Sequence, residues 1–213
     1  MSILFGPDPI PYSNGALSTV ASSSYSTLTG ESSLNVSGNH LVPSAFNADN
    51  ANYVNATALA TVPDDQWAQV TILSPNTQTG GGSGGDGIGC ELRMSTSART
   101  CYRLLCGNTA ITFSKFTSGT WSGVLASATG LTIAAGDVFY GEIQGTTIII
   151  QQNGVQRLST TDSSIASGRF GLGHSSDTAG TPQMDDFSAG DFDVSVPPDY
   201  TPGVANLTAR RMI

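Results

Sequence analysis

The sequence feature that most restricts the possible folds of this chain is a pair of strand-like runs joined by Asn-Gly. The segment TTIIIQQNGVQRLST, residues 146–160, places Asn153 and Gly154 between two runs rich in β-branched residues. Both residues adopt positive φ at low cost, as the two central positions of a type I′ turn require. The segment therefore predicts a β-hairpin.

Other segments alternate between apolar and polar residues with a period of two, the pattern of a strand with one buried face. WAQVTIL, residues 67–73, shows this pattern, and so does IGCELRM, residues 88–94. The second segment places Cys90 inward as a small hydrophobic residue and Glu91 and Arg93 on the opposite face. Further strands are predicted at TCYRLLC, AITFSKF, DVFYGEIQ and TTIIIQQ.

The composition agrees with an all-β fold. Ser, Thr, Gly and Asn are abundant while Lys and Glu are scarce, which weakens helices and suits short strands joined by turns. The 213 residues predict one domain, 30–194, between two extended arms. Residues 1–29 form an N-terminal extended segment and first strand, whose Pro-rich start is expected to lie outside the sheet, and residues 195–213 form a C-terminal arm.

The charge, the apolar runs and the N-terminal sequence of the chain each indicate something about its partners or its location. A formal net charge of -8 argues against nucleic-acid binding, which depends on clustered Lys and Arg. No apolar run approaches the roughly 20 residues that span a bilayer, so no membrane insertion is expected. The start MSILFGPDPIPYS lacks the pattern of a signal peptide, which predicts synthesis in a host cytoplasm.

The cysteines are expected to be reduced thiols. Cys90, Cys101 and Cys106 are an odd set in a chain without an export signal, so a disulfide framework is not predicted. A zinc site would need a fourth ligand, and His40 and His174 lie far away in the sequence.

The order of several short motifs resembles the concanavalin A-like lectin/glucanase superfamily. It is most similar to the laminin-G-like jelly rolls of bacteriophage structural proteins, over about residues 30–194. The motifs are NADNANYVN, DDQWAQVTI, GDVFYGEIQGTTIIIQQNGVQ, TDSSIASGRFGLG and MDDFSAGD. The resemblance implies a two-sheet antiparallel jelly-roll sandwich whose first and last strands lie near one another, with 168–174 and 186–193 as closing strands.

Glucanases of this superfamily carry alternating acids, such as E-x-D-x-E, on one strand. This chain has no such pattern, and Glu31, Glu91 and Glu142 are each isolated. Paired carboxyl groups at a set separation are what glycoside hydrolysis requires. We therefore expect no enzyme activity, and polysaccharide hydrolysis is the least favoured alternative.

The adjacent acids Asp185 and Asp186 allow two interpretations. Neighbouring strand residues point to opposite faces, so only a loop or bulge would bring both carboxylates together. In one interpretation, one aspartate caps the turn before them and the other is solvated. In the other, Asp177, Asp185 and Asp186 hold Ca²⁺ at the rim of the sandwich, because hard cations take carboxylate oxygens from irregular loops.

Carbohydrate binding would use aromatic platforms beside amide or carboxylate groups. The candidates are Trp121, Tyr102, Asn108 and Asp86. Trp121 is expected in a turn, within TSGTWSGVL, where its indole would be exposed. The alternative for this tryptophan, and for Trp67, is packing in the core or at an edge.

The resemblance and the missing acids together favour a non-enzymatic virion structural protein, a phage capsid decoration or a tail- or fibre-associated protein. Its expected partners are other virion proteins, further copies of itself and host glycans, and its expected location is the virion. A carbohydrate-binding adhesin is the alternative function.

Overall fold

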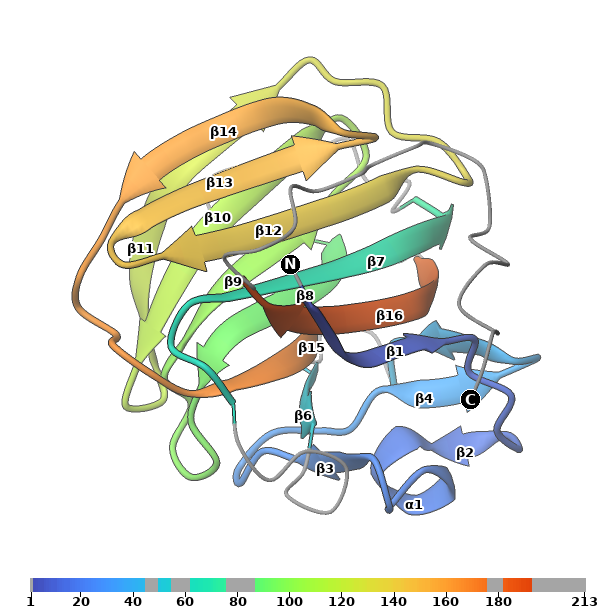
Figure 1. The fold of residues 1–213 in the computed structure, drawn as a ribbon. Coiled ribbons are helices and arrows are strands. Elements are labelled where there is room, and N and C mark those ends of the chain that lie inside the picture. The colour runs from blue at the N-terminus through green and yellow to red at the C-terminus, as the bar shows by residue number, and fades with distance from the viewer. Residues whose placement is uncertain (1, 45–49, 55–61, 76–86, 176–181, 193–213) are drawn as a thin grey trace, which may run out of the picture.

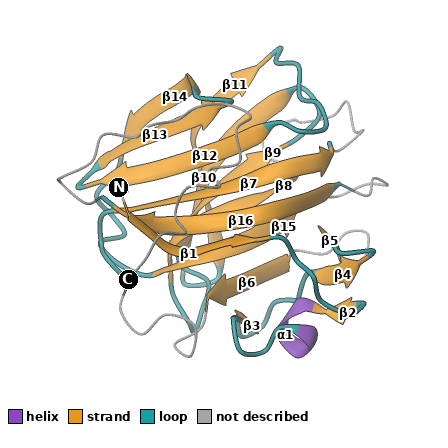
Figure 2. Cartoon of the chain, turned by 45° about the vertical axis from the view of Figure 1, so that its right-hand side comes forward, coloured by secondary structure: helices purple, strands orange, loops and turns teal. Residues whose placement is uncertain are grey.

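The computed structural model describes residues 2–44, 50–54, 62–75, 87–175 and 182–192. Over these residues the chain forms two antiparallel sheets that pack face to face (Figure 1). The one helix in this part of the chain, α1 (Leu17–Val20), lies with several short strands at one end of the sandwich (Figure 2). The predicted all-β jelly-roll sandwich is confirmed.

The larger sheet has nine strands in the order β14-β13-β12-β7-β16-β5-β4-β2, and β1 also pairs with β16. Their bounds are β1 (Ser2–Asp8), β2 (Gly15–Ala16), β4 (Asn35–Ser37), β5 (His40–Val42), β7 (Gln66–Ser74), β12 (Val138–Gln144), β13 (Thr147–Gln152), β14 (Val155–Thr161) and β16 (Gln183–Asp191).

The smaller sheet has seven strands in the order β11-β10-β9-β8-β15-β6-β3. Their bounds are β3 (Tyr25–Thr27), β6 (Asn50–Val54), β8 (Gly87–Met94), β9 (Cys101–Cys106), β10 (Ala110–Thr117), β11 (Thr120–Thr129) and β15 (Arg169–Ser175). The strands predicted from alternation are all present. The two closing strands, β15 and β16, are also present, and β16 begins three residues before the predicted start at 186.

The Asn-Gly pair forms the predicted hairpin between β13 and β14. Asn153 and Gly154 have φ values of 53° and 74°, which is the left-handed backbone that a type I′ turn requires. The hairpin between β10 and β11 uses the same geometry at Ser118 and Gly119, with φ values of 51° and 81°.

The core lies between the two sheets. Ala68, Val70 and Ile72 on β7 are buried on its inner side, as their alternation predicts. Strand β8 departs from the expected pattern, because all eight of its residues are buried. Its outer face, which carries Glu91, is therefore covered as well as its inner face.

The N-terminal segment is part of the larger sheet. The expectation that its Pro-rich start lies outside the sheet is wrong, because β1 pairs with β16. The pairing has two register shifts, and Pro7 falls in one of them, where no ladder hydrogen bond is needed from its nitrogen. The pairing also confirms that the first and last strands lie side by side. The predicted C-terminal arm, 195–213, lies outside the described residues.

The three cysteines are free and fully buried, as expected for reduced thiols. Burial raises the pKa of the Cys90 thiol to about 12, so the group stays neutral. Within the described residues, no helix has the length and hydropathy of a membrane span.

Candidate functional site

The outer face of the seven-stranded sheet carries a row of charged side chains. On β8, Glu91 alternates with the core residues Cys90 and Leu92, and on β9, Arg103 alternates with Tyr102 and Leu104. Glu91 and Arg103 lie directly opposite each other in the ladder. Their side chains therefore meet on the face that points away from the core.

Glu91 receives two guanidinium groups. Arg99 Nη2 lies 2.5 Å and Arg103 Nε 2.9 Å from Glu91 Oε1, and both groups donate to that oxygen. Arg99 also approaches Glu31, with Nη1 3.4 Å from Oε1. All but Glu31 are almost fully buried, so the charges depend on one another to offset their desolvation.

Two glycines on β15 make room for this cluster. A Cβ atom at Gly173 would lie 2.3 Å from Glu91 Oε1, and one at Gly171 would lie 2.4 Å from the Met94 sulfur. Any larger residue would force these side chains to move. The glycine spacing in GRFGLGH therefore keeps β15 bare, so that side chains from β8 can lie over it.

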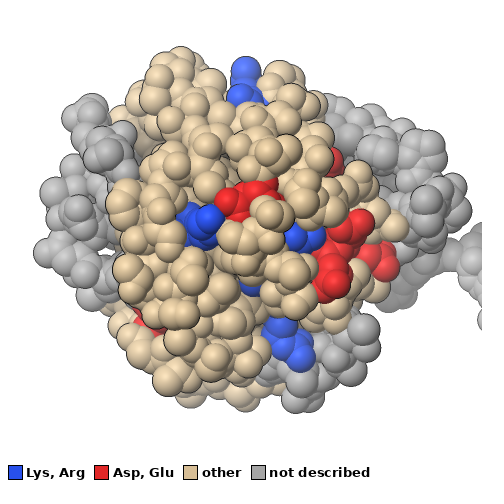
Figure 3. Space-filling model, turned by 90° about the vertical axis from the view of Figure 1, so that its left-hand side faces the viewer, with Lys and Arg blue, Asp and Glu red and all other residues tan. Residues whose placement is uncertain are grey.

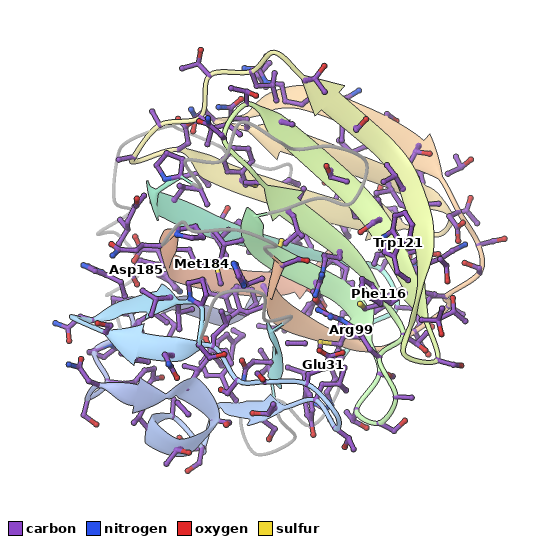
Figure 4. All side chains as sticks on the ribbon, turned by 180° about the vertical axis from the view of Figure 1, so that it is seen from behind. Glu31, Arg99, Phe116, Trp121, Met184 and Asp185 are labelled. Carbon is purple, nitrogen blue, oxygen red and sulfur yellow. The ribbon has the colours of Figure 1, made fainter. Side chains whose placement is uncertain are left out.

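An aromatic pair continues the cluster toward the solvent. The guanidinium carbons of Arg99 and Arg103 lie 4.4 Å and 4.7 Å from the ring centre of Phe116, within cation–π range. Phe116 lies opposite Trp121 in the ladder between β10 and β11. The indole is 45% exposed, and Figure 4 shows Trp121, Phe116, Arg99 and Glu31 following one another along one side of the molecule.

Trp121 is exposed as predicted, although it does not lie in a turn. The turn is at Ser118 and Gly119, and Trp121 is the second residue of β11. Val124 joins it on the same face, because Phe116 and Ser114, their partners on β10, are two residues apart. The indole is thus held on a paired strand and has an exposed aliphatic neighbour.

The structure does not bring the other sugar-binding candidates to Trp121. Tyr102 is fully buried and faces the core, where its ring stacks on Phe113 at 5.8 Å. Asn108 lies in the turn before β10, and the first residue of that strand, Ala110, is already six residues and about 20 Å along the strand from Phe116, the partner of Trp121. Asp86 lies outside the described residues.

Trp67 is packed against its neighbours and not exposed, as the alternative interpretation predicted. It is 4% exposed, its indole N–H donates to the Asp191 carbonyl at 3.0 Å, and its ring stacks on Tyr140 at 5.9 Å. The two tryptophans of the chain therefore differ sharply in exposure.

The candidate calcium residues are only partly described, because Asp177 lies outside that part of the chain. Asp185 directly precedes a bulge in β16, and Asp186 lies within that bulge with a φ of 52°. The Asp186 N–H donates to Asp185 Oδ1 at 2.8 Å, and His40 Nδ1 lies 3.8 Å from Asp185 Oδ2. The described residues hold no group of three or more His, Cys, Asp or Glu side chains suited to a metal. The calcium site stays a prediction.

Asp162 has a structural role. Its carboxylate accepts hydrogen bonds from Tyr102 Oη at 2.6 Å, from Lys115 Nζ at 2.9 Å and from Ser164 N at 2.8 Å. Burial alone would raise the pKa of Asp162, but the bonds from Ser164, Tyr102 and Lys115 outweigh it and hold the pKa below its usual value. These bonds tie the connection between β14 and β15 to the seven-stranded sheet.

Similar solved structures identify the fold. A carbohydrate-binding module, CBM66 from Bacillus subtilis, is 17% identical with a TM-score of 0.56, over 78% of this chain and 94% of that one. The carbohydrate recognition domain of Emp46p in its potassium-bound form is 10% identical with a TM-score of 0.57, over 89% and 98%. A lichenase derived from a mouse hindgut metagenome is 11% identical with a TM-score of 0.55, over 88% and 98%.

No protein-family model matches the chain, and no curated protein sequence does. The solved structures are concanavalin A-like, so the expected superfamily resemblance is confirmed at the level of the fold. The chain has the concanavalin A-like lectin/glucanase fold.

Proposed function

We propose that this chain is a carbohydrate-binding module without catalytic activity, and that it binds sugar on the outer face of the seven-stranded sheet beside Trp121. The observation that carries the proposal is the 45% exposed indole, held on a paired strand next to Phe116 and exposed Val124. A rigid aromatic ring offers its apolar face to a sugar ring at a low cost in conformational entropy.

The surroundings suit a neutral ligand. Figure 3 shows one side of the molecule, where most of the surface is uncharged and acidic and basic side chains lie close together across its middle. Strand β11 carries no charged residue, and Arg99 and Arg103, which lie over the Phe116 ring on the neighbouring strand β10, are paired with Glu91. Stacking and hydroxyl hydrogen bonds, rather than ion pairs, would therefore dominate binding. The carbohydrate-binding proteins among the similar structures support the same class of ligand.

The state of Glu91 supports the absence of catalysis. A glycosidase needs a carboxyl group that reaches the substrate, either as a nucleophile or as an acid with a raised pKa. Glu91 is fully buried, and its Oε1 accepts hydrogen bonds from two guanidinium groups. It therefore suits a role in packing the sheet better than one in bond cleavage.

The test is a glycan array followed by calorimetric titration of the best ligand. We expect Trp121→Ala to weaken binding at least tenfold, or about 1.4 kcal/mol, because stacking is lost. Val155→Ala, an exposed apolar position on β14, is the matched control and leaves affinity unchanged. A wild-type protein that binds no glycan, or a Trp121→Ala variant with full affinity, contradicts the proposal.

We also propose, on the resemblance in motif order to bacteriophage structural proteins, that the module is carried on a virion and contacts other virion proteins. The C-terminal arm would make the contacts with those virion proteins. Mass spectrometry of purified particles should find the chain in stoichiometric amount, and deletion of residues 196–213 should abolish its incorporation. Normal incorporation of the truncated protein would overturn the role of the arm, and absence from particles would overturn the location.

A further inference from the structure

We propose that Asn14 is a site of spontaneous deamidation, and that the fold protects the second Asn-Gly pair of the chain, at Asn153, from the same reaction. The side chain of an asparagine that precedes glycine is open to attack by the next backbone nitrogen, because glycine carries no side chain to shield that nitrogen. The proposal rests on how the two amide side chains are held, and it does not depend on sugar binding.

The reaction needs only the chain itself and water. The backbone nitrogen of Gly15 attacks Cγ of Asn14, the bond between Cγ and Nδ2 breaks, and the proton lost from the nitrogen leaves with Nδ2 as ammonia. Water then opens the resulting five-membered imide at one of its two carbonyl carbons. The products are aspartate and isoaspartate, so an amide is replaced by a negatively charged carboxylate.

The surroundings of Asn14 leave its side chain free to react. The residue is exposed and lies in a bend directly before β2. Its Oδ1 accepts a hydrogen bond from the backbone N–H of Gly38 at 3.0 Å, and this donor can stabilise the negative charge that develops on Oδ1 when Cγ is attacked. Within the described residues Nδ2 has no hydrogen-bond partner, so the amide can rotate about its single bond to Gly38 and release Nδ2 to water.

The side chain of Asn153 is held at both ends. Its Oδ1 also accepts from a backbone N–H, that of Val138 at 2.8 Å, but its Nδ2 donates to Asp137 Oδ1 at 2.7 Å. The Asp137 carboxylate is itself fixed by a bond from Gln152 Nε2 at 2.8 Å. Cγ of Asn153 therefore cannot turn toward the nitrogen of Gly154 without the loss of both bonds. The difference between the two Asn-Gly pairs lies at Nδ2.

Conversion of Asn14 alters one edge of the larger sheet. Strand β2 pairs with β4 through only two residue pairs, Gly15 with Val36 and Ala16 with Asn35. Isoaspartate at position 14 adds one carbon atom to the main chain directly before this pairing, which shifts its register. The modification therefore loosens β2 from β4, while the ladders of the other strands do not include the altered peptide.

The experiment is peptide mapping by mass spectrometry of the full chain, incubated at mildly alkaline pH both folded and in urea. In the folded chain we expect Asn14 to deamidate at least tenfold faster than Asn153. In urea the two sites should react at similar rates, because the fold no longer distinguishes them. Equal rates in the folded chain, or a rate at Asn14 that is at least tenfold lower in the folded chain than in urea, would overturn the proposal.

A single substitution tests the protection of Asn153. Asp137→Ala removes the acceptor of Nδ2, so the rate at Asn153 should rise at least tenfold toward the rate in urea. Asn14 in the same molecule is the internal control and should react as it does in the wild-type chain. An unchanged rate at Asn153 in the folded variant contradicts the protective role of Asp137. If the variant does not fold, the comparison of the folded and urea-treated wild-type chain decides.

Discussion

Gly173 determines where a charge can lie on the outer face of the smaller sheet. Its missing Cβ leaves the space that the Glu91 carboxylate occupies, and the carboxylate in turn binds Arg99 and Arg103. The sequence alone indicates that glycines in this strand allow close packing, but it does not say which side chain fills the space. That depends on the register between β15 and β8.

We expect Gly173→Ala to lower the free energy of unfolding by about 1–3 kcal/mol, because the added Cβ would lie 2.3 Å from Glu91 Oε1. Chemical denaturation measures the loss. In a Glu91→Ala background the same substitution should cost clearly less, since the clashing group is gone. Equal costs in both backgrounds would contradict this account of the glycine.

Asp162 predicts a dependence of stability on pH. Its pKa is lowered in the folded state, so the unfolded chain binds a proton first as the pH falls. The stabilisation is therefore complete above the ordinary aspartate pKa of about 3.9 and is lost as the pH falls toward the lower folded pKa.

The measurement is the free energy of unfolding from pH 6 downward. Wild-type protein should lose more stability below about pH 4 than Asp162→Asn does. Tyr102→Phe, which removes one donor to Asp162, should give an intermediate slope. Parallel pH profiles for the wild-type protein and Asp162→Asn would be inconsistent with this role.

At the scale of elements, alternation predicts where strands occur but not where they are interrupted. The bulges in β8, β11 and β16 arise from register with a partner strand, which no local pattern reveals. This explains the misplacement of Trp121, since the Gly- and Ser-rich residues around it are typical of a turn. The same cause explains why the Pro-rich start was wrongly expected outside the sheet, since the irregular pairing of β1 with β16 accommodates Pro7.

Arg93, which lies at a bulge in β8, binds three segments that connect strands. Its Nε, Nη1 and Nη2 donate to the carbonyl oxygens of Asp64, Ile165 and Gly145 at 2.8, 2.8 and 2.9 Å. We expect Arg93→Lys to lower the free energy of unfolding by about 2–4 kcal/mol, because an ammonium group cannot reach all three acceptors. Arg157→Lys, at an exposed position, is the control. A loss for Arg93→Lys within about 0.5 kcal/mol of that control would contradict the role of Arg93.

At the scale of the whole molecule, the order of motifs was sufficient to predict the sandwich and its closing strands. The cluster of Glu91, Arg99 and Arg103 was not predicted, because it joins two neighbouring strands and the loop between them in three dimensions. Alternation indicated an outer-face Glu91, but the covering of that face depends on the packing of the complete chain. The exposure of Trp121 was predicted for the wrong local reason.

The contrast between the two tryptophans provides the most direct test of sugar binding. Trp67 is buried and Trp121 is exposed, so intrinsic fluorescence can report on each through the variants Trp121→Phe and Trp67→Phe. The measurement is a titration of the best glycan from the array, with tryptophan emission as the readout. The account predicts a saturable blue shift in the wild-type protein and in Trp67→Phe, lost in Trp121→Phe. A shift that persists in Trp121→Phe would contradict it.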